Sequence, residues 1–429
     1  MREMKDSGAP WLGYIPANWQ VDKLKYHLVR NEPRNPGEKI VLSLYRELGV
    51  IPKDSRDDNH NVTSEDTSNY KYVRPGDFVI NKMKAWQGSV AVSDYEGIVS
   101  PAYFIYNFTD DVYYRRYFHY LMRSCYKDEF MRLSGGIRVG QWDLPSSSLD
   151  NVAVLIPPKV EQRAIAEFLD RRCAEIDAIA ADLQSQIDVL EQYRCSIITE
   201  AVTNGLNPDA EMKDSGYDWV GMMPSTWVMR KGKYMFVQRS LRGNSIELQL
   251  LSPTQKFGVI PQSLYEELTG MSAVKLSEKA DLSLLKTIHK GDFCISLRSF
   301  QGGFEYSEYE GVVSPAYQVF YPTVEIADGY YRYLFKESGF IEKMNSYTMT
   351  LRDGKNIAFA DFGNTYIPYP PVDEQAAIAA YLDERCAQID AIIADKRRQL
   401  EVIDEYKKSL IFEYVTGKKA VGGEPHGIS

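Results

Sequence analysis

Lysine, tryptophan and glutamine occur together in a short loop of the first half of the chain, between two apolar, strand-like runs. The residues of this loop that can contact a ligand are Lys82, Lys84, Trp86 and Gln87. Lysine can bind guanine O6 and N7, and glutamine can bind adenine N6 and N7. The matching loop of the second half contains Arg298, Phe300 and Gln301. These residue types predict a surface that contacts the edges of nucleic-acid bases, although the two aromatic rings also suit a hydrophobic core.

A second loop has the same character and differs between the halves. In the first half it reads RLSGGIRVGQW, and the candidate residues are Arg132, Arg138 and Gln141. In the second half it reads NSYTMTLRDGKN, and the candidates are Tyr347, Arg352 and Lys355. Two glycines beside an arginine let the backbone approach a groove closely. Loops that differ in this way are expected if the halves read different base sequences.

The elements that position these loops are duplicated. Residues 157–203 and 370–416 are identical at 26 of 47 positions without a gap. Two further pairs occur in the same order: MKDSGAPWLGYIPANW with MKDSGYDWVGMMPSTW, and GDFVINKMKAWQGSVAVSDYEGIVSPAY with GDFCISLRSFQGGFEYSEYEGVVSPAY, which has one residue deleted. The segments 20–73 and 228–288 share almost nothing, and neither do 130–150 and 343–363. The chain is therefore a tandem duplication with a repeated scaffold and divergent insertions.

The duplication divides the chain into five predicted parts. Residues 1–156 and 206–369 are two globular units, 157–205 and 370–416 are two helices, and 417–429 is a tail. The repeated tryptophans, namely Trp11, Trp19, Trp219 and Trp227, are expected to be structural.

The segment from 161 to 203 contains neither proline nor glycine and is rich in helix-forming residues. A Pro-Pro pair precedes each copy, and Gly205 and Gly417 follow the two copies, which are typical starts and stops of a helix. Forty-three residues at 1.5 Å each make a rod of about 65 Å. Cys173 and Cys386 occupy matching positions, where a small buried residue is expected.

Apolar residues recur at a 3–4 spacing along both helices and predict a partner for each. One possibility is an amphipathic helix packed on its own globular unit. The other, which we favour, is an antiparallel coiled coil between the two copies, related by a pseudo-twofold axis. The predicted interface consists of Ile165, Leu169, Ile176, Ile179, Leu183, Leu190, Tyr193, Ile197, Ile378, Leu382, Ile389, Ile392, Ile403, Tyr406 and Leu410.

Short apolar runs separated by glycine and proline turns predict strands in both globular units. Helices are expected over 112–132 and 327–345, and a strand is expected just before each Pro-Pro pair. The fold class is therefore α+β: two α/β globular domains separated by a long antiparallel two-helix coiled coil.

Composition limits the class of protein. No apolar run reaches the ~18 residues of a membrane span. The five cysteines form no CxxC pair, which favours an intracellular, reduced protein without a disulfide framework or a zinc site. The net charge of −9 resides almost entirely in the two helices, which carry −4 each, so both globular units are near neutral. Basic residues can then gather on one face of each unit and attract a duplex.

Three repeated signatures resemble the specificity subunit of type I restriction–modification systems. They are the Ser-Gly-x-x-Trp-x-Gly-x-x-Pro-x-x-Trp opening at Ser7 and Ser215, the Gly-Ile/Val-Val-Ser-Pro-Ala-Tyr strand at Gly97 and Gly311, and the Pro-Pro-x-x-Glu-Gln-x-x-Ile helix start. Together they cover nearly the whole chain, twice and in order.

The resemblance implies that each globular unit reads one half of a bipartite DNA site. It implies that the coiled coil sets the spacing and carries two methyltransferase subunits, which hold S-adenosylmethionine and methylate adenine at N6. An ATP-dependent, Mg-dependent translocating nuclease can join the same scaffold. The chain itself would hold no cofactor or metal, catalyse nothing and work in the cytoplasm.

The residues themselves agree in one respect. The chain contains no Asn/Asp-Pro-Pro-Tyr, no GxGxxG after a strand and no Walker loop, so a catalytic residue is not predicted. Two alternatives remain open at this stage. One is a coiled-coil adaptor or acidic DNA mimic that reads no DNA, and the other is a self-sufficient DNA methyltransferase with an unusual motif.

Overall fold

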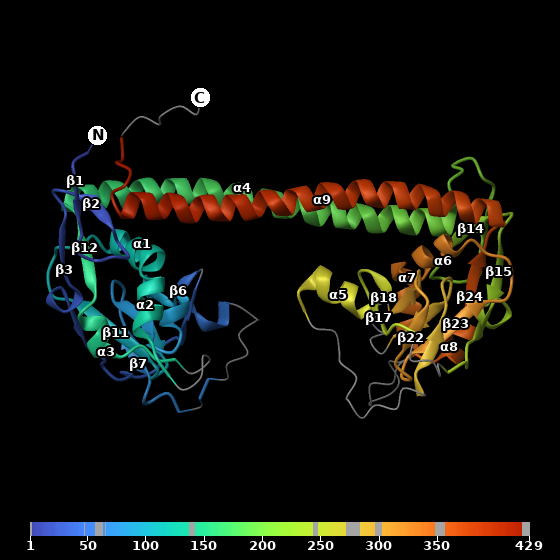
Figure 1. Ribbon diagram of the computed structural model, residues 1–429, viewed down its shortest axis with the longest axis horizontal. Coiled ribbons are helices and arrows are strands. Elements are labelled where there is room, and N and C mark those ends of the chain that lie inside the picture. The colour runs from blue at the N-terminus through green and yellow to red at the C-terminus, as the bar shows by residue number, and fades with distance from the viewer. Residues whose placement is uncertain are drawn as a thin grey trace. The chain divides into compact units, whose positions relative to one another are not determined.

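The computed structural model describes residues 2–46, 48–55, 63–64, 66–136, 142–242, 248–271, 284–296, 303–347 and 357–422. The candidate residues Arg138, Gln141, Arg298, Phe300, Gln301, Arg352 and Lys355 lie outside these ranges. The chain forms two compact units (Figure 1): unit 1 comprises residues 1–183 and 398–429, and unit 2 comprises residues 184–397.

Unit 1 contains twelve short strands, three short α-helices and three 3-10 helices in its described part, besides its share of the two long helices. Its strands are β1 (Met4–Asp6), β2 (Tyr14–Pro16), β3 (Gln20–Lys23), β4 (Leu28–Arg30), β5 (Leu42–Tyr45), β6 (Gly49–Pro52), β7 (Lys71–Val73), β8 (Phe78–Asn81), β9 (Val90–Val92), β10 (Gly97–Val99), β11 (Tyr103–Phe108) and β12 (Ala153–Ile156). Its α-helices are α1 (Arg115–Cys125), α2 (Lys127–Leu133) and α3 (Ser146–Asp150), and its 3-10 helices are η1 (Leu24–Tyr26), η2 (Lys53–Ser55) and η3 (Ala85–Gln87).

Unit 2 repeats this plan. Its strands are β13 (Met212–Asp214), β14 (Met222–Pro224), β15 (Val228–Lys231), β16 (Phe236–Gln238), β17 (Leu251–Thr254), β18 (Gly258–Pro261), β19 (Lys286–Ile288), β20 (Phe293–Ile295), β21 (Phe304–Tyr306), β22 (Gly311–Val313), β23 (Gln318–Pro322) and β24 (Tyr366–Tyr369). Its helices are η5 (Gly232–Tyr234), α5 (Gln262–Thr269), α6 (Asp328–Leu334), α7 (Ser338–Ser346) and α8 (Phe359–Asn364).

Strand pairing follows one antiparallel scheme in both units. A four-stranded sheet in the order β4-β11-β8-β9 forms the centre of unit 1, and β16-β23-β20-β21 forms the centre of unit 2. The two-stranded pairs β3–β12 and β15–β24 also correspond. The duplication read from sequence is therefore a duplication of topology, and the predicted α+β class is confirmed.

Each unit also contains part of two long helices. The first, α4, runs from Lys159 to Asn204, and the second, α9, runs from Val372 to Val415. Gly205 and Gly417 follow them with φ of 76° and 71°, a left-handed conformation that glycine adopts without a steric penalty. A Cβ at Gly417 would lie 2.5 Å from Pro16 Cγ, so this position also needs glycine for space.

The sequence predicts one helix over 112–132, and the structure contains two. Tyr126 ends α1 and begins α2. Its ring is fully buried, lies 4.4 Å from that of Trp11, and its hydroxyl donates to the Ala153 carbonyl oxygen at 3.0 Å. This packing outweighs local helix propensity. In unit 2 the predicted helix over 327–345 also breaks, because the Glu337 carboxylate accepts from the Phe340 N–H and starts α7.

Candidate nucleic-acid interface and helical scaffold

The Pro-Pro-x-x-Glu-Gln motif attaches each long helix to its globular unit. The Glu161 carboxylate accepts from the indole Nε1 of Trp19 at 3.0 Å, and Glu374 accepts from Trp227 at 2.9 Å. Burial raises the pKa of Glu161, but hydrogen bonds from Arg2, Trp19 and Asn18 outweigh it and lower the pKa below its ordinary value. The repeated Trp19 is therefore structural, as expected.

The glutamine of the same motif acts on the backbone. Gln162 accepts from the Tyr114 N–H at 2.7 Å and donates to the Val112 and Pro157 carbonyl oxygens. Gln375 repeats this arrangement at Ala327 and Pro370. A buried peptide group needs a hydrogen-bond partner. Gln162 supplies partners for the turn that precedes α1, and Gln375 does so for the turn that precedes α6. The motif therefore positions each globular unit against the start of its long helix.

Tyrosines from the globular units bind the far ends of the long helices. In unit 1 the Tyr117 hydroxyl donates to the Val415 carbonyl oxygen of α9 at 2.8 Å. In unit 2 the Tyr330 hydroxyl donates to the Val202 carbonyl oxygen of α4 at 2.7 Å. These bonds satisfy carbonyls that the last turn of a helix leaves without a partner. Each globular unit therefore holds the start of one long helix and the end of the other.

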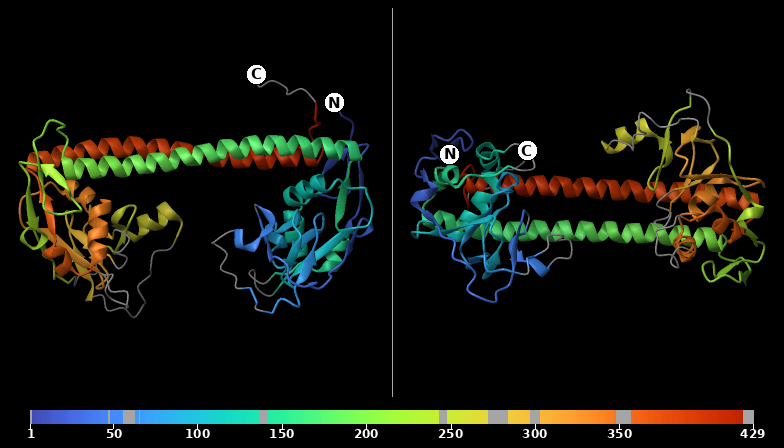
Figure 2. Two further views of the ribbon diagram at one scale, coloured as in Figure 1. Left: turned by 180° about the vertical axis from the view of Figure 1, so that it is seen from behind. Right: turned by 90° about the horizontal axis from the view of Figure 1, so that it is seen from below.

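The long helices run antiparallel within each unit (Figure 2). In unit 1 the rings of Phe168 and Tyr414 are 4.4 Å apart, and Asp177 pairs with Lys407 at 2.5 Å. In unit 2 Arg194 pairs with Asp390 at 3.3 Å. As residue numbers rise along α4, those of its partners on α9 fall. The predicted antiparallel pairing is confirmed.

The seam between the helices differs from the predicted stripe at four positions. Nine predicted residues are buried: Ile165, Leu169, Ile176, Leu183, Ile197, Ile378, Leu382, Ile389 and Leu410. Leu190 and Ile403 are half-buried. Ile179, Tyr193, Ile392 and Tyr406 are between 46% and 54% exposed. The 3.5-residue repeat explains the difference, because the seam passes through Ile187 and Ile393 and leaves these four residues beside it.

The four residues form part of two matched apolar surfaces. We call Ile179, Val402 and Tyr406 apolar patch 1, in unit 1. We call Ile392, Val189 and Tyr193 apolar patch 2, in unit 2. Arg172 lies seven residues before Ile179 and bonds to Tyr406, and Arg385 lies seven residues before Ile392 and bonds to Tyr193. Each patch therefore lies along one side of the seam and includes both helices.

Both patches face away from their globular units. Asp170 bonds to Arg116 and Tyr120 of unit 1, and Asp383 bonds to Tyr333 of unit 2. Ile179 and Ile392 lie nine residues further along the same helices, about two and a half turns, and hence on the opposite face. All six patch residues are identical between the two copies, whereas the matching seam positions Leu183 and Lys396 differ.

The predicted base-contacting loop of unit 1 forms a hydrogen-bonded turn. The 3-10 helix η3 follows β8, and Gly88 ends it in the left-handed region. Trp86 Nε1 donates to the Met83 carbonyl oxygen at 3.1 Å, and its ring lies 5.5 Å from that of Trp142. Lys82 pairs with Asp143 at 3.0 Å. The structure therefore brings this loop beside the end of the second candidate loop.

The remaining candidate residues differ in their exposure and in their hydrogen bonds. Lys84 is exposed and Gln87 is half-buried. Arg132 is mostly exposed but forms two hydrogen bonds to the Glu129 carboxylate, at 2.7 and 2.8 Å. Tyr347 is half-buried, and its hydroxyl lies 3.1 Å from that of Thr365. Their contact with bases stays a prediction.

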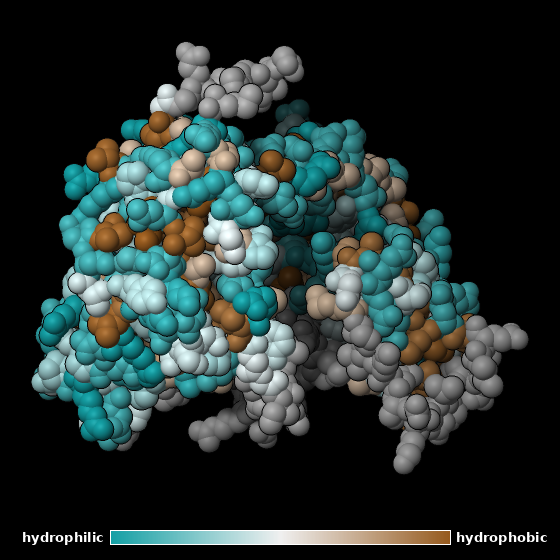
Figure 3. All heavy atoms as spheres, turned by 60° about the vertical axis from the view of Figure 1, so that its left-hand side comes forward, coloured by the Kyte–Doolittle hydropathy of each residue, from teal (hydrophilic) through white to brown (hydrophobic). Residues whose placement is uncertain are grey.

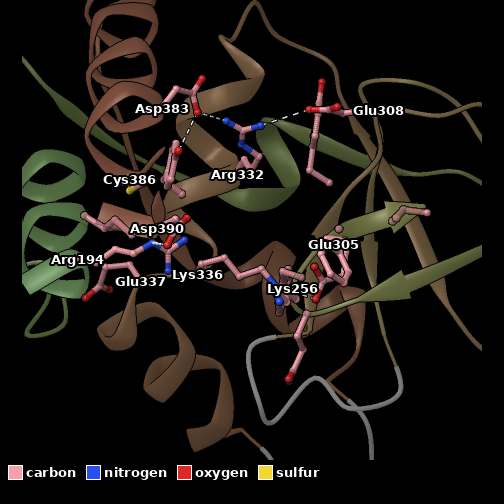
Figure 4. Close-up of a pocket in the computed structure, with 18 of the residues that line it drawn as sticks. Arg194, Lys256, Glu305, Glu308, Arg332, Lys336, Glu337, Asp383, Cys386 and Asp390 are labelled. Atoms are coloured by element: carbon pink, nitrogen blue, oxygen red, sulfur yellow. Dashed lines mark hydrogen bonds and ion pairs between the residues drawn. The ribbon is translucent and has the colours of Figure 1, made fainter. Parts of the chain in front are cut away.

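Unit 2 contains a charged cavity of about 820 Å³ between its helices and the β17–β18 hairpin (Figure 4). Lys336 pairs with Glu305 at 2.6 Å, and Arg332 bonds to Glu308 and Asp383. Glu305 is 1% exposed, and burial raises its pKa to about 6. Sequence reasoning misses this cluster, because its members come from segments far apart in the chain.

Within the described ranges, no three His, Cys, Asp or Glu side chains are placed to hold a metal ion. In the same part of the chain, no helix combines the length and apolarity that crossing a membrane requires.

Known proteins resemble the chain over most of its length. A family model described as "Type I restriction modification DNA specificity domain" matches residues 31–188 and 230–402. A putative type I restriction enzyme MjaX specificity subunit from Methanocaldococcus jannaschii is 22% identical over 436 residues, which cover 95% of each chain. The type I restriction enzyme EcoKI specificity subunit of Escherichia coli strain K12 is 21% identical, over 70% of this chain and 64% of that protein.

A solved structure shares the fold. It comes from work on complex assembly and conformational transition of the type I R-M system, and it superposes with a TM-score of 0.66. The alignment covers 94% of this chain and 99% of that one at 15% identity, so it carries information on the fold alone.

Proposed function

The chain belongs to the type I restriction modification DNA specificity family, with two copies of its domain, and we propose that each globular unit reads one half of an asymmetric, two-part DNA site. The observation that carries this proposal is the contrast within the duplication: a matched scaffold holds loops that differ. Two like readers would need like loops, whereas the loop that ends at Trp142, whose ring contacts Trp86 of η3, has a counterpart of different sequence in the second half.

Reading is assigned to the loops after β8 and α2 in unit 1 and to their counterparts in unit 2. Lys84 and Gln87 offer a cation and an amide to base edges. Arg138, Gln141, Arg298, Gln301, Arg352 and Lys355 are proposed on residue type alone. Lys82 is assigned a different role, because its ion pair with Asp143 holds the two loops of unit 1 together.

The paired helices are proposed to carry two methyltransferase subunits, one on each apolar patch. Exposed apolar side chains that repeat in the same arrangement fit two copies of one partner. Their outward direction leaves the globular units free for DNA. In this proposal the chain is non-catalytic. The partners bind S-adenosylmethionine and methylate adenine at N6, and a nuclease that uses ATP and Mg can join the same scaffold in the cytoplasm.

Selection from a random-sequence duplex library tests the reading function. The chain, assembled with its methyltransferase, is expected to retain duplexes with two blocks of fixed bases separated by a constant number of unread ones. Retained duplexes without a common two-block pattern would contradict the proposal and favour an adaptor. The chain alone, incubated with labelled S-adenosylmethionine and DNA, is expected to transfer no methyl group.

A further inference from the structure

A short surface motif occurs in both units, inside segments whose sequences otherwise diverge. Residues 23–29 read KLKYHLV, and residues 231–237 read KGKYMFV. Both stretches end a strand, form a 3-10 turn and begin the next strand. The caps agree closely: φ and ψ are −118° and −19° at His27, and −117° and −31° at Met235. The two stretches therefore share one backbone.

In this motif the residues that point inward differ between the units, and the residues that point outward are identical. The inward positions differ between the units, as Leu24 and Gly232, His27 and Met235, and Leu28 and Phe236. The outward positions are identical. They are Lys23, Lys25, Tyr26 and Val29 in unit 1, and Lys231, Lys233, Tyr234 and Val237 in unit 2. Packing normally constrains inward residues most strongly, so the repeated outward set requires a cause outside the fold. We call each set a Lys–Tyr patch.

Both patches are basic and largely exposed, with only Lys231 half-buried. Tyr26 is 59% exposed and Tyr234 is 66% exposed. Lys25 and Lys233 each lie with Nζ 5.5 Å from the ring of the tyrosine that follows. Figure 3 shows separate hydrophobic spots on a largely hydrophilic surface, and the patch residues Val29 and Val237 are exposed apolar residues.

Lys25 and Lys231 contact neutral groups of the fold. Lys25 Nζ donates to the neutral amide of Asn151 at 3.0 Å, and Lys231 lies over the ring of Tyr366 at 5.2 Å. In the part of the chain that the structure describes, none of the four lysines pairs with a carboxylate. Asp22 adjoins the patch of unit 1, but His27 lies 3.4 Å from its carboxylate, and its counterpart in unit 2 is the cation Arg230.

We infer that the two Lys–Tyr patches bind the sugar–phosphate backbone of the DNA. This inference rests on the proposed reading function. Two units that read different bases meet only one thing in common on a duplex, the backbone. Lysines release counterions when they neutralise phosphates, and tyrosine hydroxyls donate to phosphate oxygens. The apolar patches instead lie on helices that carry a net charge of −4 each, which separates a DNA contact from a protein contact.

The test removes one lysine from each patch, as Lys25→Ala with Lys233→Ala, in the full chain assembled with its methyltransferase. Binding to a fluorescent duplex is measured between 50 and 200 mM salt. Two lost phosphate contacts make the slope of log K against log salt shallower by about 1.8. The affinity advantage of the unsubstituted complex then shrinks by about 12-fold across this salt range. The effect is equal on a selected duplex and on a random one.

Two further variants make the result specific. Lys5→Ala with Lys290→Ala removes two exposed lysines elsewhere, one from each unit, and is expected to leave the slope unchanged. Lys25→Arg with Lys233→Arg keeps the charge and is expected to keep the slope.

Three results would overturn the inference: a slope equal to that of the control, a change in the selected bases, or loss of the methyltransferase in gel filtration without DNA. The last would make the patches protein interfaces. A failed library selection with the unsubstituted complex would instead refute the reading function.

Discussion

Replacing Ile179 by glutamate should remove one methyltransferase subunit and leave the other. Ile179 is 54% exposed and lies in apolar patch 1, and its counterpart Ile392 lies in apolar patch 2. Full burial of an isoleucine side chain contributes about 1.5–3 kcal/mol. Burial of the exposed half therefore contributes about 1 kcal/mol to docking. A carboxylate at the same place adds a desolvation cost of about 2 kcal/mol or more.

Together these terms weaken docking at one patch by about 3 kcal/mol, which is about a hundredfold in Kd. Native mass spectrometry with increasing methyltransferase should show one subunit bound at concentrations that give two with the unsubstituted chain. Ile392→Glu should give the same stoichiometry, and the double variant should bind neither subunit. The free chain should stay folded, because the side chain is already half in water.

The matched control is Ala178→Glu, one residue away and exposed. About 100° of helix rotation separates it from Ile179, so it should bind two subunits with unchanged affinity. Equal losses from Ala178→Glu and Ile179→Glu would refute the assignment of the patch. Two subunits bound normally by the double variant would show that docking uses another surface.

Two single residues and the length of the long helices can be tested separately. Glu161→Ala leaves the buried indole N–H of Trp19 without its acceptor and should lower the urea unfolding free energy of unit 1 by about 1–3 kcal/mol. Burial raises the folded pKa of Glu305 from 4.5 to about 6, so the folded state binds the extra proton and stability should fall as pH rises from about 4.5 to about 6. The loss in unfolding free energy is about 2 kcal/mol. Urea titrations across that pH range should show no such loss for Glu305→Gln, and an equal loss in this variant would refute Glu305 as its cause. Insertion of four residues after Leu183 should change the number of unread bases or prevent assembly while leaving the read bases as they were; different bases at constant spacing would contradict the spacing role.

Repetition and helical periodicity made the architecture predictable from sequence. The two copies of the long helix differ enough to show which apolar positions are repeated. Their proline and glycine flanks mark the ends of the helices within about two residues. The seam was harder to place, because Ile179 and Tyr193 fit a 3–4 spacing as well as Ile187 does. Only the register against α9 decides which of them is buried.

Features that depend on tertiary packing escaped sequence reasoning. The break at Tyr126 results from the contact with Trp11, which lies far away in the chain. The cluster around Glu305 likewise joins residues from separate segments. The Lys–Tyr patches were missed for another reason: their inward residues differ, so the segments that contain them scarcely align. Only the burial pattern shows that the identical residues of the two segments, Lys25 and Lys233 among them, are the exposed ones.

The central claim is that two unlike reading units act on one duplex through a shared helical scaffold. Adenine methylation mapped across the genome of cells that express the chain with its methyltransferase tests this claim most directly. We expect N6-methyladenine in a single asymmetric context of two fixed blocks at constant separation, and substituting Lys84 and Gln87 of unit 1 by alanine should change one block only. Methylated adenines in one undivided motif, or in no common context, would contradict the account.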